Sequence, residues 1–352
     1  MKKSLLFLAI SWFLVSCSTK EEEIYTPVPY QLEIPKLFKD KLIDPVIPSN
    51  NPLTFEGVEL GKKLFFDKIL SKNKTKSCSN CHNPESSFTN NLQFSEGVNG
   101  DFGFRNSMPL INLAWNYDEF FAWDGKELTL EKQALEPITN PLEMDGNWDV
   151  IIERLNNHNT YPELFQNAFG IKTIDSSHVA KALAQFERTI ISGNSKFDKY
   201  ILGEETLTPE EQNGFNVFMD EERGDCFHCH GSNNNPLWTD NQFHNNGLDT
   251  SFSDLGLGAI TGDPSDYGKF KTPSIRNLVF TSPYMHDGRF ATIEEVINHY
   301  SEGLQPSATI DPLMKKVANG GVRLSTKDKD DLKSFLLTLT DYEMLNNPNY
   351  ID

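Results

Sequence analysis

The hydrophobic positions of this chain recur mostly at the spacing of an α-helix. In residues 177–191, the side chains of Val179, Leu183 and Phe186 fall on one face of a helix. The same spacing predicts helices that begin at Thr54 and Thr208 and others that cover residues 150–155, 161–169, 292–300 and 332–339. No segment alternates convincingly in the way expected of a strand. The pattern therefore predicts a mainly α fold with many loops.

Breaks in this pattern predict how the chain is divided. Residues 18–52 contain three consecutive glutamates and six prolines, which predicts a tether that becomes an extended strap. Residues 192–195, Ser-Gly-Asn-Ser, interrupt the helical pattern. We therefore predict an N-terminal domain of residues 53–195 and a C-terminal domain of residues 196–352. Gly61–Asp67 and Gly214–Asp220 align weakly, which is a hint of duplicated domains.

Residues 1–17 have the features of a signal peptide. Two lysines precede a mostly apolar run from Leu5 to Val15 that is too short to span a bilayer. Residues 14–17, Leu-Val-Ser-Cys, resemble the box of bacterial lipoproteins, in which the cysteine is acylated and becomes the new N-terminus. The alternative is an ordinary signal peptide cut nearby. The sequence thus predicts a protein on the periplasmic side of the cell envelope or at the cell surface, held by a lipid anchor on Cys17.

The charge of the chain narrows the choice of partners. Of the 352 residues, 50 are acidic and 32 are Lys or Arg, which gives a net charge of −18. This balance argues against nucleic acid and favours basic or neutral partners. A merely solvated acidic surface would account for the same charge.

The strongest chemical signal is a pair of C-x-x-C-H motifs. They are Cys78-Ser79-Asn80-Cys81-His82 and Cys226-Phe227-His228-Cys229-His230, and they use four of the five cysteines. In this motif the two thiols bond the edge of a haem and the adjacent imidazole ligates the iron. A zinc knuckle is the alternative. The motifs predict two cytochrome c-like domains, each enclosing one covalently bound haem c, with His82 and His230 as iron ligands.

Further motifs resemble those of the bacterial di-haem cytochrome c peroxidases and the related MauG-like proteins. The resemblance covers about residues 53 to 340, with the motifs in the order of the family. Besides the two haem motifs, it rests on Leu60–Asp67, Phe88-Thr89, Arg105-Asn106, Phe121–Gly125, Gln133, Pro137–Met144 and Pro283–Gly288.

The resemblance implies roles for three further side chains at the N-terminal haem and between the haems. Gln133 and Glu143 match a glutamine and a glutamate on the distal face of the N-terminal haem. Splitting peroxide requires a proton to move between its two oxygens, and a nearby carboxylate can carry that proton. Trp123 matches a tryptophan that bridges the two haems. A surface carboxylate at Glu143 and a core aromatic at Trp123 are the plainer interpretations.

The resemblance also implies a calcium ion between the haems. Asn106 matches a side-chain ligand, and Thr281 and Pro283 match positions that ligate through backbone carbonyls. Oxygen ligands of this kind suit calcium, with waters completing the shell.

The sequence departs from the commonest peroxidases at two positions. Where those enzymes have a histidine that closes the N-terminal iron, this chain has Val98. Where they have a methionine on the C-terminal haem, it has Tyr300, which resembles the MauG-like proteins. Tyr300 is therefore a candidate iron ligand, with Met285, Met314 or no residue as the alternatives.

These features predict a di-haem cytochrome c peroxidase that reduces hydrogen peroxide to water. His82 would hold the peroxidatic haem and His230 the electron-transfer haem. The electron donor would be a small redox protein such as a cytochrome c, and a second copy of the chain is a further expected partner, as a homodimer. Two alternatives remain: a MauG-like oxidase of a protein substrate, and a non-enzymatic di-haem electron carrier.

Overall fold

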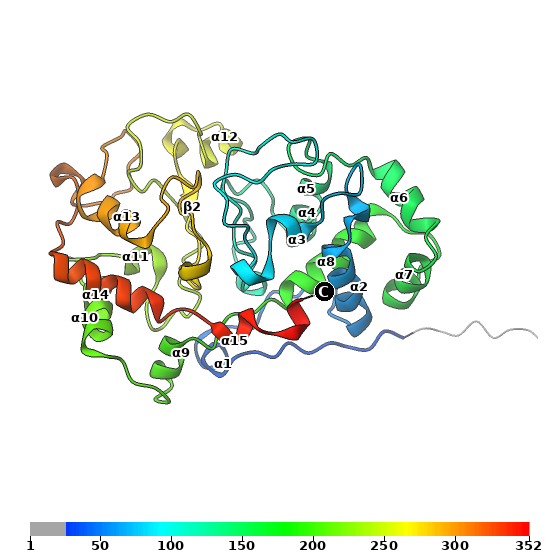
Figure 1. Ribbon diagram of the computed structural model, residues 1–352, viewed down its shortest axis with the longest axis horizontal. Coiled ribbons are helices and arrows are strands. Elements are labelled where there is room, and N and C mark those ends of the chain that lie inside the picture. Colours follow the sequence, from blue (N-terminus) through cyan, green and yellow to red (C-terminus); the bar gives the residue numbers. More distant parts are fainter. Residues whose placement is uncertain (1–25, 352) are drawn as a thin grey trace, which may run out of the picture.

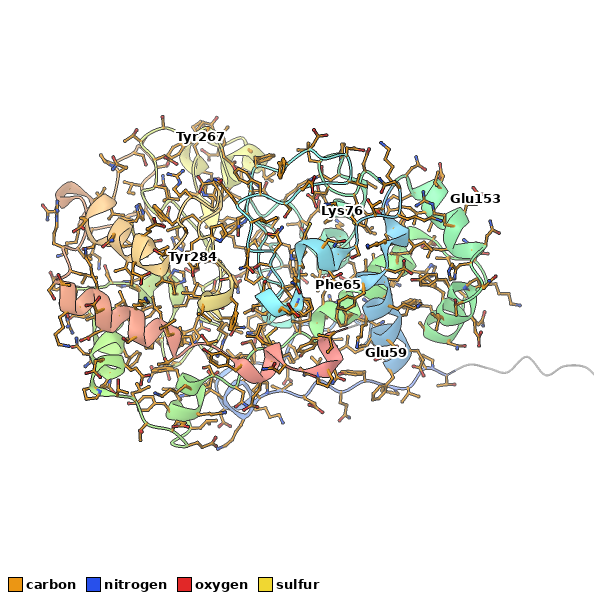
Figure 2. The ribbon with its side chains drawn as sticks, in the orientation of Figure 1. Glu59, Phe65, Lys76, Glu153, Tyr267 and Tyr284 are labelled. Carbon is orange, nitrogen blue, oxygen red and sulfur yellow. The ribbon has the colours of Figure 1, made fainter. Side chains whose placement is uncertain are left out.

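The computed structural model describes residues 26–351 and confirms a mainly helical, loop-rich fold with two halves (Figure 1). After α1 (Lys36–Lys41), one half contains α2 (Phe55–Phe66), α3 (Cys78–Cys81), α4 (Leu130–Gln133), α5 (Glu136–Thr139), α6 (Trp148–Asn156), α7 (Tyr161–Phe169) and α8 (Ser176–Arg188). The other half contains α9 (Lys196–Ile201), α10 (Pro209–Met219), α11 (Phe227–His230), α12 (Leu257–Thr261), α13 (Ile293–Asn298) and α14 (Thr326–Leu337), followed by α15 (Tyr342–Leu345). Phe65 and Lys76 lie in the first half and Tyr267 and Tyr284 in the second (Figure 2).

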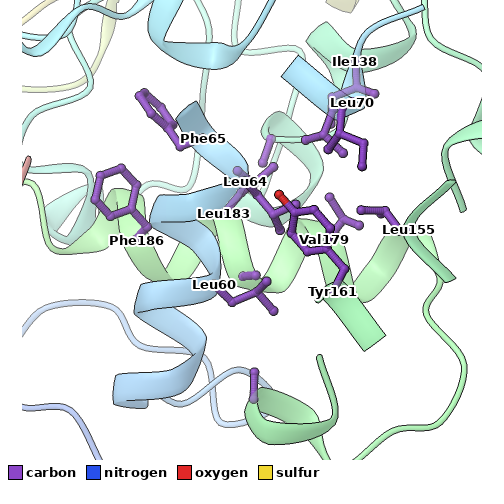
Figure 3. Packing of buried hydrophobic residues seen from close by; sticks show 14 of the residues in the cluster. Leu60, Leu64, Phe65, Leu70, Ile138, Leu155, Tyr161, Val179, Leu183 and Phe186 are labelled. Atoms are coloured by element: carbon purple, nitrogen blue, oxygen red, sulfur yellow. The ribbon is translucent and has the colours of Figure 1, made fainter. Parts of the chain in front are cut away.

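The core of the first half lies between α2 and α8 (Figure 3). Leu60, Leu64 and Phe65 from α2 pack against Leu183 and Phe186 from α8, and all five are almost completely buried. The sequence starts α2 with Thr54, whose side-chain oxygen accepts a hydrogen bond from the amide of residue 57 at 3.0 Å. This apolar packing fixes the end of α2, from which the chain leads to the first haem motif.

The core of the second half is aromatic. Phe197 and Phe218 each contact both Trp238 and Phe335 edge to face, and Trp238 contacts Phe335 in the same way, with ring centroids between 5.1 and 5.8 Å apart. Such geometry adds to the hydrophobic burial of each ring. Capping boxes start α10 and α13, as the sequence predicts.

One glycine sits at an equivalent point in each half. A Cβ added at Gly61 in α2 would lie 1.9 Å from the carbonyl oxygen of Ala182 in α8. A Cβ added at Gly214 in α10 would lie 1.9 Å from the carbonyl oxygen of Asp331 in α14. In both halves, therefore, the helix before the haem motif crosses a later helix so closely that only glycine fits. This matching geometry supports the weak sequence repeat as a structural one.

The structure differs from the predicted elements in several places. The helix predicted for residues 177–191 ends at Arg188, and the one predicted for 292–300 passes at His299 into η6, a π-helical turn (His299–Gly303). A two-stranded antiparallel ladder, β1 (Phe243–His244) with β2 (Phe270–Lys271), was not predicted. Two paired residues are too few to give an alternating pattern that sequence reasoning could detect.

The two ends of the described chain link the two halves. The N-terminal segment contacts both halves, and the C-terminal segment returns from the second half to the first. In residues 26–53, the ring of Phe38 packs 5.2 Å from Trp115 of the first half and 5.3 Å from the guanidinium of Arg276 of the second. Near the other end, Met344 and Tyr350 join the core of the first half. Figure 1 shows α15 reaching back toward α2 and α8. The division at residue 195 stays a prediction, and these segments hold the two halves together.

Residues 1–25 lie outside the described part of the chain, and so do the predicted signal peptide and the predicted lipid anchor at Cys17. Among residues 26–351, no helix is both long and apolar enough to cross a membrane.

The glycine crossings give a first testable prediction. Gly61→Ala and Gly214→Ala should each lower the free energy of unfolding by about 1 to 3 kcal/mol, because the new methyl group would be forced against a helix carbonyl. Guanidinium unfolding of the haem-loaded protein measures this loss. Gly103→Ala is the matched control, since an added Cβ there meets open space. Equal stability of all three variants would contradict the close-crossing account.

Candidate haem sites

The first haem motif is held by the short helix α3 and the loop that follows it. The amide of Ser77 donates to the side-chain oxygen of Asn80 at 2.8 Å, which fixes the start of the helix. The thiols of Cys78 and Cys81 are free and partly buried. Two thiols one helical turn apart, followed at once by an imidazole, form the donor set for a covalently attached haem.

The structure assigns the hydrogen on the His82 ring. Nδ1 of His82 lies 2.9 Å from the carbonyl oxygen of Phe88, which can only accept. An imidazole that donates from Nδ1 to this carbonyl has its lone pair on Nε2, the nitrogen that would ligate an iron. Burial also lowers the pKa of His82 and keeps the ring neutral.

The loop that supplies this carbonyl has an uncommon backbone. Ser87 and Phe88 both have left-handed φ angles, 52° and 61°, and both are completely buried. The amide of Phe88 donates to the carbonyl of Asn83 at 2.8 Å, and the amide of Asn83 donates to the carbonyl of Thr89 at the same distance. These bonds direct the Phe88 carbonyl toward the imidazole.

The second motif opens onto a cavity of about 220 Å³. Cys226, Cys229 and His230 line it, and Nδ1 of His230 is buried without a hydrogen-bond partner among the described residues. Burial lowers the pKa of His230 to about 4. Most of the remaining wall is apolar, with Phe218, Ile293, Ile297, Leu332 and Leu336 among its residues. A neutral imidazole, two free thiols and an apolar cavity fit a haem.

Tyr300 lines the same cavity from η6. Its hydroxyl accepts a hydrogen bond from Nδ2 of Asn246 at 3.1 Å, and burial raises the pKa of Tyr300. The sulfur of Met285 lies 3.5 Å from the same Nδ2, and Met314 also lines the cavity. All three side chains that the sequence offers as ligands for this iron therefore line the cavity.

Glu143 lies in the turn after α5, beside the loop that carries Val98. The Val98 amide donates to the Glu143 carbonyl at 2.6 Å. The position at which the commonest peroxidases have a histidine is therefore next to this glutamate. Burial and the nearby charge of Glu136 raise the pKa of Glu143 to about 7, and Nδ2 of Asn140 donates to its Oε1 at 2.8 Å. At neutral pH the carboxyl group can thus take up or release a proton.

Gln133 ends α4 and is partly buried. Within the described residues, no hydrogen bond joins it to Glu143. The structure thus brings Glu143 and Val98 into contact and places Gln133 one short helix earlier.

Trp123 connects the two halves. It belongs to the chain segment of the first half, yet it lines the cavity of the second motif. Its ring N–H donates to the carbonyl of Asn106 at 2.8 Å, and its own carbonyl accepts from the amide of Lys271 at 2.9 Å. His286, which also lines this cavity, stacks on Phe270 with ring centroids 3.6 Å apart.

The predicted calcium ligands lie where the two halves meet. The amide of Asn106 donates to the carbonyl of His286 at 2.7 Å, which holds it against the segment that contains Thr281 and Pro283. Nδ2 of Asn106 donates to the carbonyl of Leu92 at 2.8 Å, which leaves Oδ1 as the acceptor. An amide oxygen is one of the oxygen ligands that calcium takes in proteins, so Asn106 keeps the atom that the predicted site needs.

Sequence reasoning missed one charged cluster beside the second motif. His244 lies between Asp240, 2.8 Å from its Nε2, and Asp311, 2.6 Å from its Nδ1. Burial opposes a charge on this ring, but Asp240, the Cys229 thiol and Asp311 together raise the pKa of His244 well above its usual range. Cys229, Asp240 and His244 are close enough to hold a metal ion, but the haem motif uses the Cys229 sulfur. The spacing of Asp240 and His244 was the available sequence signal, whereas Asp311 was too distant in the chain to find.

Comparisons with known proteins show the family to which this chain belongs. The family described as di-haem cytochrome c peroxidase matches residues 55–206. The methylamine utilization protein MauG of Methylorubrum extorquens is 39% identical over 305 residues, which cover 83% of this chain and 80% of that protein. Cytochrome c551 peroxidase of Nitrosomonas europaea is 34% identical over 256 residues, which cover 71% of this chain and 74% of that protein.

A solved structure extends the similarity to the fold. It is that of a MauG-like protein associated with microbial copper homeostasis, with a TM-score of 0.82 and 34% sequence identity. The match covers 92% of this chain and 99% of that one. The two haem motifs and these similarities show that this chain belongs to the di-haem cytochrome c peroxidase and MauG family and is an oxidoreductase that acts on hydrogen peroxide.

Proposed function

We propose that this enzyme uses hydrogen peroxide to oxidise a side chain of a protein substrate, as the resemblance to MauG-like proteins implies. The observation that carries the proposal is Tyr300, which lines the cavity of the second motif at the position where the commonest peroxidases have a methionine. Val98 adds to it, because an aliphatic side chain beside Glu143 cannot close an iron.

The acid and base chemistry falls to Glu143. A haem on Cys78, Cys81 and His82 would supply the Lewis acid and redox centre for peroxide. The ionised carboxylate of Glu143 takes a proton from one peroxide oxygen and returns it to the other, and its pKa of about 7 suits both steps. Asn140 orients the carboxylate, and Gln133 would hold the peroxide by hydrogen bonding. Peroxide gains two electrons and two protons and leaves as two waters.

The two electrons leave the protein substrate and pass through the second half. His230 would hold the haem there, and Trp123 would bridge the two haems, since it reaches from the first half into the second cavity. A phenolate from Tyr300 is a hard anion that stabilises ferric iron, so it would lower the potential of this haem relative to a methionine ligand. A lower potential of this haem would make it a poorer store for one electron and would let it share oxidising equivalents with the first haem.

The second candidate function is the first interpretation of the sequence, a cytochrome c peroxidase that takes its electrons from a small redox protein. The similarity to the peroxidase of Nitrosomonas europaea favours it. The two functions share the peroxide chemistry at Glu143 and differ in the source of the electrons.

The remaining parts of the proposal concern cofactors and location. We propose two covalent haem c groups, one in each predicted domain, and a calcium ion held by Asn106, Thr281 and Pro283. The protein would lie outside the cytoplasm, where c-type haem is attached, with a lipid on Cys17. Metal analysis of the purified protein and mass spectrometry of its N-terminal peptide test these points. A calcium-free protein with both haems in place, or an unmodified cysteine, would count against them.

The chemistry at Glu143 gives a prediction about pH. In the native enzyme, kcat/KM for peroxide should rise through about pH 7, because the carboxyl group must be ionised before it can accept a proton. Glu143→Gln should keep both haems, flatten this profile and lower kcat/KM by about 10² to 10⁴.

Glu143→Gln should lower activity without lowering the stability of the protein. The folded-state pKa of Glu143 lies above its unfolded value, so native Glu143 costs stability as pH rises from about 4.5 to 7. The glutamine variant should therefore be at least as stable as the native protein at pH 8.

Glu136→Gln is the control for the pH profile of kcat/KM: it removes a neighbouring charge and should shift the inflection of that profile to lower pH without abolishing turnover. Near-native turnover by Glu143→Gln would refute the proton-transfer role.

Tyr300→Phe tests the second haem, because it removes only the hydroxyl. If Tyr300 ligates the iron, the variant should lose the His/Tyr ferric spectrum and raise the potential of that haem. Tyr284→Phe is a matched control, since Tyr284 lines the same cavity while its hydroxyl donates to the carbonyl of Leu278 at 2.7 Å. An unchanged ferric spectrum and potential in Tyr300→Phe would remove Tyr300 from the iron and favour the cytochrome c peroxidase function.

A further inference from the structure

Asn277 lies in the second half of the protein, yet its side chain contacts the loop behind the first haem motif. It is completely buried and has a left-handed φ of 59°, which asparagine tolerates better than most residues. Its Nδ2 donates to Oγ of Ser87 at 2.9 Å, across 190 residues of sequence. The same Nδ2 lies 3.3 Å from Oγ of Ser192, in the segment that joins the two halves.

The other atoms of Asn277 are fixed by the second half. Its Oδ1 accepts from the amide of Asp341 at 2.8 Å, and its backbone amide donates to the carbonyl of Leu339. The side chain therefore cannot rotate to follow Ser87 without breaking a buried hydrogen bond, which is costly. Asn277 acts as a rigid support against which the loop of Ser87 rests.

That loop determines the position of the iron ligand. Ser87 directly precedes Phe88, whose carbonyl oxygen receives the hydrogen of His82 Nδ1 at 2.9 Å. Both loop residues hold left-handed φ angles that cost energy in any residue with a Cβ, so contacts from outside the loop must maintain them. The hydroxyl of Ser87 is the point at which the second half supplies such a contact.

The residue before Asn277 makes the corresponding contact at the second motif. The guanidinium of Arg276 is completely buried, forms a two-pronged ion pair with Asp198 at 2.7 and 2.8 Å, and donates to the carbonyl of Pro236 at 2.6 Å. Pro236 lies in the loop that follows His230. Two adjacent residues thus hold the loops that follow both haem motifs.

We propose that Asn277 is a positioning residue for the N-terminal haem: through Ser87 it sets the Phe88 carbonyl that orients His82, so that the second half controls the proximal side of the first iron. Partners of this kind tune metal ligands by fixing the ring and raising its basicity, and their loss typically lowers metal affinity or activity about 10- to 100-fold. The inference rests on His82 as an iron ligand and not on the identity of the substrate.

The test compares Ser87→Ala with Ser192→Ala in the haem-loaded protein. Both variants remove one completely buried hydroxyl that contacts the same Asn277 amide. Spectroelectrochemistry gives the ferric/ferrous equilibrium of each haem, electron paramagnetic resonance assigns the two irons, and thermal unfolding reports stability. No peroxide is needed, so the result is independent of the proposed reaction.

Ser87→Ala should change the ferric/ferrous equilibrium of the His82 haem by about threefold or more and leave the His230 haem unchanged. Ser192→Ala should lower the unfolding temperature while both haems keep their potentials. If Ser87→Ala does not fold, Ser87→Gly replaces it, because glycine adopts the left-handed φ without strain. Unchanged potentials in the Ser87 variant, or equal shifts in both serine variants, would reduce Asn277 to a structural residue and overturn the proposal.

Discussion

The close crossing of two helices at a glycine is the constraint on which each half of this protein depends. At Gly61 and at Gly214 the backbone of one helix meets a carbonyl of another with no room for a Cβ. In both halves the chain then turns out of the first helix and enters a haem motif within a short loop. The crossing brings apolar side chains from distant segments together and fixes where that loop begins. A wider crossing would move the cysteines and the histidine relative to their core.

The two halves share the helix crossing and the haem motif that follows it, but the side chains around the two motifs differ in their chemistry. Near the first motif, a partly buried carboxyl group with a pKa of about 7 lies beside the aliphatic Val98, which suits proton transfer at an open iron. Around the second, an apolar cavity is lined by Tyr300, whose hydroxyl has a pKa raised by burial. Trp123, Asn106 and Asn277 each reach from one half to the other. The two candidate haem sites therefore have different linings, and these three residues link the halves that contain them.

Sequence reasoning succeeded where the information is local. The haem motifs, the capping boxes at Thr208 and Thr292, and the main helices each depend on residues a few positions apart, and the structure contains them. Gly61 and Gly214 gave only a weak repeat, because the carbonyls that explain them lie far along the chain. The ladder of β1 and β2 was too short to leave a pattern.

Long-range polar contacts could not be predicted in this way. Nothing near Ser87 in the sequence indicates that Asn277 will donate to it, and nothing near His244 indicates Asp311. The return of Tyr350 to the first core depends likewise on the whole fold. The resemblance to a family implies that Glu143 lies at the first haem, but the raised pKa of Glu143 depends on burial and on Glu136, which only the structure supplies.

If Val98 leaves the first iron without a closing ligand, peroxide should react with the fully oxidised enzyme. The most direct measurement is electron paramagnetic resonance of the protein as isolated, followed by addition of hydrogen peroxide without any reductant. We expect a high-spin ferric signal from the His82 haem that disappears at once on mixing. Two low-spin signals that do not respond to peroxide, or a response that appears only after one haem is reduced, would contradict it.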